Sequence, residues 1–135
     1  LIEWIIKTEL LEPIKPLLNA GMIFEAIVLM LNNISANSVF YKKALKLEGA
    51  VTFNQIAMKC VYEMFMNIIS EKSTGKKSKY RWLTPEVIST YYAQSLCFIT
   101  EGWIAQGMDD IEPKEMAEAY MYLITRSMDD ILSEL

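Results

Sequence analysis

One stretch near the end of the chain restricts the fold more than any other. Between Glu86 and Asp109 the only formal charge is Glu101. A helix packed on one side of a domain normally keeps a charged face toward water. The apolar side chains here point in several directions around the predicted helix instead: Ile88, Tyr91, Tyr92, Leu96, Phe98, Ile99, Trp103 and Ile104. Such a helix has to be covered on both sides, by the domain core on one and most simply by a second chain on the other.

The last predicted helix has a similar but less extreme pattern. Polar side chains form one stripe at helical spacing, and a broad apolar arc takes up the rest of its surface. The stripe consists of Glu115, Glu118, Tyr122, Arg126, Asp129 and Ser133. Two helices with wide apolar arcs can meet their symmetry mates in a two-fold four-helix bundle. The residues expected at this dimer interface are Tyr91, Ser95, Phe98, Gly102, Trp103, Tyr120, Leu123, Ile124, Met128 and Ile131. The alternative is a monomer in which 84–106 is a central core helix.

Apolar residues at helical spacing predict an all-α fold, a bundle of about six helices in a single domain covering residues 1–135. Five glycines and four prolines are too few for many short strands and turns. The predicted helices run from Leu1 to Pro13, from about 22 to 33, 37 to 49, 52 to 69, 84 to 106 and 113 to the end. Thr84 and Pro85 match the N-cap and first position of a helix.

The composition argues against catalysis, metal binding and cofactors. The chain has no histidine. Its two cysteines, Cys60 and Cys97, are too few for a four-thiolate metal site. No glycine-rich phosphate loop occurs, so we expect no catalytic residues, no metal and no cofactor. The net charge of −4 argues against direct nucleic-acid binding by these residues.

We expect neither a signal peptide at the start of this sequence nor a membrane span within it. The most apolar run, Ala20 to Leu31, contains Glu25 and falls short of the roughly 20 residues that a bilayer requires. Two cysteines in apolar helices fit a reducing compartment, and we expect a cytoplasmic protein. Because the chain begins at Leu1 in a helical pattern, we expect an N-terminal part to be missing.

A polar, basic segment from Ser70 to Leu83 is predicted as a loop. Its cations and aromatics, Lys76, Lys77, Lys79, Tyr80, Arg81 and Trp82, fit either of two interpretations. One is a nucleic-acid contact with stacking aromatics. The other is a solvated loop without a binding role, whose Trp82 and Leu83 fold back onto the following helix.

Methionines and aromatics supply the adaptable surface that lines apolar ligand sites, although such residues are more often plain core. The candidate ligand-binding residues are Phe24, Met58, Tyr62, Phe65, Tyr92 and Glu101. Because Glu101 is a lone carboxylate, we expect it either to pair across the dimer or to face a pocket. A pocket that Glu101 faces would prefer a cationic or hydroxylated ligand, and the apolar candidate residues would suit a small apolar or amphipathic one.

Three segments carry a resemblance to a known family. Asn37 to Phe53, with Phe40-Tyr41 and Ala44-Leu45, resembles the middle of TetR-type regulator C-terminal domains. The stretch from Tyr91 through Trp103 to Met108, followed by 113–117, is similar to their closing helix pair. The opening Leu1-Ile2-Glu3-Trp4-Ile5 resembles the helix after the DNA-binding module, as in the subgroup related to dihydroxyacetone-kinase regulators of Gram-positive bacteria.

The resemblance implies a bacterial transcription regulator, usually a repressor, that dimerises through its last two long helices. It also implies an effector pocket in this domain, and an operator-binding helix-turn-helix in the N-terminal part that this sequence lacks. Two alternatives stay open: a dimerisation or protein-interaction module without a small-molecule ligand, and an unrelated monomeric helical adaptor.

Overall fold

The computed structural model of the chain is all-helical and describes residues 1–47, 49, 51–73 and 78–135, which contain no strand. This confirms the predicted fold class. In chain order the elements are α1 (Ile2–Ile5), the π-helical η1 (Ile6–Leu11), α2 (Lys15–Asn19), α3 (Ile23–Ala36), α4 (Ser38–Leu45), α5 (Phe53–Lys72), α6 (Pro85–Ala105), α7 (Pro113–Thr125) and α8 (Met128–Glu134).

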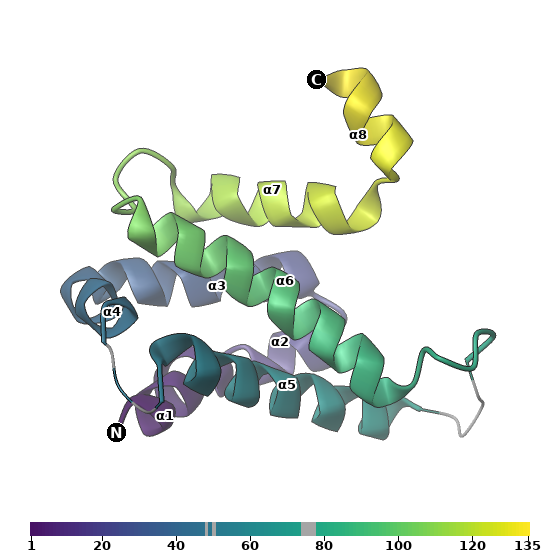
Figure 1. Cartoon of the computed structure of the whole chain (residues 1–135), viewed down its shortest axis with the longest axis horizontal. Coiled ribbons are helices and arrows are strands. Elements are labelled where there is room, and N and C mark those ends of the chain that lie inside the picture. Colours follow the sequence, from purple (N-terminus) through teal and green to yellow (C-terminus); the bar gives the residue numbers. More distant parts are fainter. Residues whose placement is uncertain (48, 50, 74–77) are drawn as a thin grey trace.

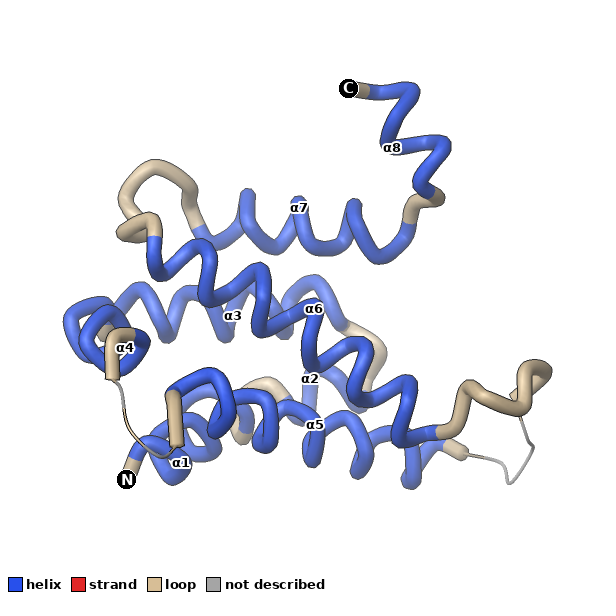
Figure 2. The backbone as a smooth tube through the Cα atoms, in the orientation of Figure 1, coloured by secondary structure: helices blue, strands red, loops and turns tan. Residues whose placement is uncertain are grey.

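Helix α6 occupies the middle of the bundle (Figure 1). It packs antiparallel to α5 on one side and to the shorter α7 on the other, while α3 lies behind and packs against α7. The buried side chains between these helices form one hydrophobic core. Figure 2 shows that short connections join most of the helices, which favours antiparallel neighbours.

Side-chain caps begin the two long helices, and the cap at Thr84 is the one that the sequence predicts. The Thr84 side chain accepts a hydrogen bond from the Val87 amide, and Pro85 takes the first turn of α6. At the start of α5, Thr52 and Gln55 form a reciprocal capping box. Each cap satisfies amides that the first helical turn leaves without an internal partner.

Several predicted boundaries are wrong. The first helix becomes α1 and η1, which end at Leu11, and the short helix α2 follows with Pro16 in its first turn. Helix α3 continues past the predicted end at Asn33 as far as Ala36, while α4 already ends at Leu45. Helix α5 continues to Lys72, into the segment predicted as a loop.

The last predicted helix is not continuous. Helix α7 ends at Thr125, Arg126 is extended, and the Ser127 side chain caps α8 by accepting a hydrogen bond from the Asp130 amide. This break divides the predicted polar stripe. Its last two residues, Asp129 and Ser133, lie on α8 and do not continue the surface of α7. Figure 1 shows α8 turning away from the rest of the bundle.

The segment before α6 also differs from the prediction. Trp82 is 76% exposed and Leu83 is half-buried, so the interpretation in which both fold back onto α6 does not hold for Trp82. Lys79, Tyr80 and Arg81 are exposed as well. The predicted cations Lys76 and Lys77 lie outside the described residues.

Candidate functional site

An exposed stripe without formal charge runs along one face of α6. Its members recur every three or four residues and therefore share one side of the helix: Tyr91, Gln94, Phe98, Gly102 and Ala105. Phe98 is 77% exposed and Tyr91 is 62% exposed. Interface centres are rich in aromatic residues and poor in charge, so this uncharged stripe is a candidate contact surface.

Two predicted interface residues prove to belong to the core. Trp103 is 3% exposed, and its indole N–H donates to the Ile111 carbonyl oxygen at 2.9 Å. Tyr120 is 4% exposed, and its hydroxyl lies 2.8 Å from the hydroxyl of Ser95. Both side chains satisfy their polar atoms inside the chain and attach α7 and its preceding loop to α6. Their assignment to the surface was wrong.

The other predicted interface residues are at least partly accessible. Tyr91, Phe98, Gly102, Leu123 and Met128 are exposed, while Ser95, Ile124 and Ile131 are partly buried. They do not form one continuous face, because Met128 and Ile131 lie on α8, beyond the break. The members on α6 and α7 stay candidates for a shared surface.

A pocket of about 390 Å³ lies among α2, α3, α5, α6 and α7. Its lining is almost entirely apolar: Ile14, Leu18, Gly21, Ile23, Ala26, Ile27, Met30, Met64, Phe65, Ile68, Ile69, Lys72, Ile88, Tyr92, Leu96, Tyr120 and Ile124. The rings of Phe65 and Tyr92 lie 6.2 Å apart. The volume falls within the range of small-molecule sites, and the lining suits an apolar ligand.

Lys72 provides the cation that borders this pocket. Its ammonium group donates to the carbonyl oxygens of Leu18 at 3.3 Å and Asn19 at 3.0 Å, at the C-terminal end of α2. Both carbonyls belong to the last turn of a helix, where a cation is favourable. Lys72 therefore connects the end of α5 to α2 beside the pocket.

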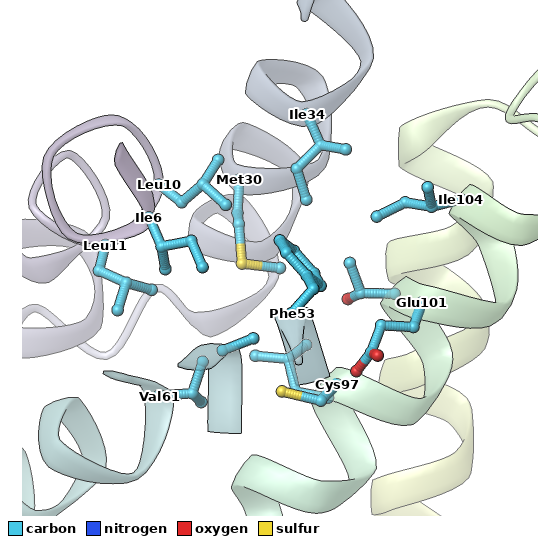
Figure 3. A pocket seen from close by; sticks show the side chains of 13 residues that line it. Ile6, Leu10, Leu11, Met30, Ile34, Phe53, Val61, Cys97, Glu101 and Ile104 are labelled. Atoms are coloured by element: carbon cyan, nitrogen blue, oxygen red, sulfur yellow. The ribbon is translucent and has the colours of Figure 1, made fainter. Parts of the chain in front are cut away.

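Glu101 belongs to a different and much smaller cavity (Figure 3). That space measures about 30 Å³ and lies between η1, α3, α5 and α6. The Glu101 carboxylate accepts a hydrogen bond of 2.7 Å from the side-chain amide of Asn54 in the same chain. Burial raises the pKa of Glu101, and the bond from Asn54 opposes that shift. Cys97 lines the same cavity, and burial, with a smaller contribution from Glu101, raises its pKa to about 12.

The predicted ligand-binding residues are thus not brought together. Phe65 and Tyr92 line the larger pocket, and Glu101 lines the smaller cavity. Phe24 borders shallow surface hollows beside α7. Met58 and Tyr62 are half-buried on α5 and line neither of the two cavities.

The contribution of α3 to the larger pocket was not predicted from the sequence. Ala26, Ile27 and Met30 form one of its walls. They recur at helical spacing in an apolar run, which marks them as inward-facing but does not distinguish pocket wall from filled core. Lys72 was predicted to lie in the loop. Its position directly after the apolar run of α5 could have indicated that it belongs to this helix.

Comparison with known proteins identifies the class of this bundle. Residues 22–126, well over half of the chain, match the family of TetR transcriptional regulator C-terminal regions (TetR_C_8). The chain belongs to the TetR family of transcriptional regulators. No curated protein and no solved structure gives a significant match.

The matched region contains helices α3 to α7. It therefore includes the parts of both cavity walls that α3, α5 and α6 provide. The family is one of regulators and not of enzymes, and this part of a TetR protein is its regulatory region. Among the described residues, no group of three or more metal-binding side chains comes together.

No single described helix is long and apolar enough to cross a membrane. Helices α3 and α4 reach the necessary length and apolarity only together, and they are bent by 89° relative to each other.

Proposed function

We propose that this TetR regulatory domain forms a homodimer through α6 and α7 and binds a small apolar or amphipathic effector in the larger pocket, acting as the regulatory part of a repressor. The observation that carries the proposal is the uncharged stripe on α6, with Phe98 and Tyr91 largely exposed.

The stripe has the chemistry of a self-complementary contact. Aromatic anchors contribute most of the energy in protein interfaces, and charged residues are depleted from interface centres. Gly102 and Ala105 are small residues on the same face and permit close approach of a second helix. A two-fold axis across this face would place α6 against its own copy, without any need for charge complementarity.

The pocket and the stripe share one helix. Tyr92 and Leu96 line the pocket from α6, while Tyr91 and Phe98 belong to the stripe on the same helix. An effector that changes the position of α6 would therefore change the contact between the two chains. Such coupling requires that the ligand favours one of two arrangements of the helix. In the proposed regulator, this arrangement sets the spacing of two DNA-binding modules on the operator.

Analytical ultracentrifugation tests the dimer with a matched pair of variants. Phe98→Glu places a charge in the stripe, and we expect it to weaken dimerisation by at least about 30-fold. Val39→Glu makes the same kind of change at an exposed position on α4 that is not a member of the stripe, and it should leave the dimer intact. A wild-type chain that stays monomeric, or equal effects of the two variants, would contradict the proposal.

Binding of an anilinonaphthalene sulfonate dye tests the pocket. Ile68→Trp fills the pocket from α5, whereas Ile56→Trp adds the same bulk to α5 outside it. We expect the first variant to lose most of the dye fluorescence and the second to retain it. A dimer whose dye binding is absent or is unaffected by Ile68→Trp would instead favour a dimerisation module without a ligand.

A further inference from the structure

Helix α8 is amphipathic and makes little contact with the rest of the described chain. None of its residues is buried, and it packs extensively against no other described helix. Met128, Leu132 and Leu135 are exposed and recur at helical spacing on one side. A helix of seven residues is not stable in water without tertiary contacts. Its apolar side therefore requires a cover.

One hydrogen bond links α8 to α7. The Tyr122 hydroxyl of α7 donates to the Glu134 carboxylate at the end of α8. Figure 1 shows that α8 points away from α6 and the rest of the bundle. The described part of the same chain therefore leaves the apolar side of α8 uncovered in this arrangement.

A groove with an apolar lining lies around the start of α6. It has a volume of about 680 Å³ and is lined by apolar groups of Trp82, Val87 and Tyr91, with Glu86 as an acidic lining residue. Tyr91 is also the first member of the uncharged stripe, so the groove continues the proposed dimer surface. Trp82 is largely exposed there, although tryptophan is a favoured anchor in interfaces.

The charges of the helix and of the segment beside the groove are complementary. Helix α8 has three acidic residues, Asp129, Asp130 and Glu134, and no basic residue. The exposed Lys79 and Arg81 directly precede Trp82 and exceed the single opposing charge of Glu86. Opposite charges at the edge of an interface guide the orientation of the partners.

We infer that α8 is an exchanged arm: in the dimer, the apolar side of α8 of one chain occupies the Trp82–Tyr91 groove of a second copy. This is recognition of an amphipathic helix by a hydrophobic groove, with anchors one turn apart. The inference rests on the proposed homodimer. It adds a second contact between the chains, separate from the stripe at Phe98.

Cysteine crosslinking between two singly substituted full chains tests the arm. Leu132→Cys and Trp82→Cys proteins are mixed, allowed to exchange subunits and oxidised. The native Cys60 and Cys97 are buried and do not compete. We expect the mixture to give a crosslinked dimer that neither protein forms alone to the same extent. The matched mixture of Leu132→Cys with Val39→Cys, exposed on α4, should not give it.

The outcomes separate this inference from the proposed function. A stable dimer in ultracentrifugation without the crosslink between positions 132 and 82 overturns the exchanged arm and leaves the homodimer in place. A monomer overturns both.

Charge reversal supplies a second readout. Replacing Asp129 and Asp130 with Lys should weaken the dimer about tenfold, and adding Lys79→Glu with Arg81→Glu should restore most of it. Unchanged association in the first variant, or no recovery in the second, contradicts the pairing.

Discussion

The two faces of α6 have similar composition but different surroundings. The inner face, with Ala93, Leu96 and Ile104, is buried by α5, α4 and α7. The outer face, with Tyr91 and Phe98, is exposed although it is equally free of charge. The lack of charge therefore has two separate causes in one helix. The bundle accounts for the inner face, and the proposed contact with a second chain would account for the outer one.

The largest expected effect of a substitution lies on the inner face. Ile104→Ala removes a side chain that is 2% exposed and enlarges the small cavity that it lines. We expect the free energy of unfolding to fall by about 2–5 kcal/mol. Urea denaturation of the variant and the wild type at equal protein concentration measures the loss. A change below about 0.5 kcal/mol, typical of surface sites, would remove the contrast between the faces.

On the outer face, Tyr91→Ser should act on association and not on folding. Removing an exposed aromatic anchor should weaken the dimer about tenfold, because interface anchors contribute on the order of 1–2 kcal/mol or more. Under dilute conditions where the chain is monomeric, its unfolding midpoint in urea should match that of the wild type. A lower midpoint there, with unchanged association, would assign Tyr91 to the core.

The Tyr120 hydroxyl of α7 contacts Ser95, which lies on α6 between the buried and the exposed face. Tyr120→Phe leaves the Ser95 hydroxyl without its partner on α7, and we expect a loss of about 1 kcal/mol in unfolding free energy. Tyr122→Phe is the matched control, because its hydroxyl is bonded to Glu134 on the exposed side. Equal losses in the two variants would show that the α6–α7 contact does not depend on the buried bond.

The smallest expected effect concerns the charge of Glu101. Its pKa is raised in the folded chain mainly by burial, so the folded state binds its proton more tightly than the unfolded state. This contribution to stability is present below the unfolded-state pKa and is lost as the pH rises through the raised one. Glu101→Gln should therefore flatten the fall in stability with rising pH above the normal range of a glutamate.

Urea denaturation at several pH values measures this effect. At each pH, the free energy of unfolding of the variant is subtracted from that of the wild type. The difference cancels the opposite contribution of Glu3, whose pKa is lowered by Lys59 and Lys7. A difference independent of pH would contradict the role of burial at Glu101.

Local chemistry made some of the fold predictable. The start of α6 follows from Thr84 and Pro85, because capping depends only on neighbouring residues. The break before α8 was missed although Ser127 is also a good cap. The apolar spacing continues across it in Met128 and Ile131, so periodicity concealed a change of direction.

The candidate site was predictable only in part, because it depends on contacts between distant residues. Phe65 and Tyr92 were chosen for their chemistry and do share a pocket. Trp103 and Tyr120 looked like surface anchors, but each has a hydrogen-bond partner inside the chain that no sequence pattern reveals. Glu101 was expected to need a partner, and the structure provides Asn54, 47 positions away.

Oxidative footprinting of the wild-type chain tests the central claim most directly. Hydroxyl radicals label accessible aromatic side chains, and the labelling is measured at protein concentrations below and above dimerisation, which ultracentrifugation defines. The account predicts that Phe98 and Tyr91 become protected on association while Trp4, which is exposed on α1, stays labelled. Association that leaves Phe98 and Tyr91 as reactive as in the monomer would contradict it.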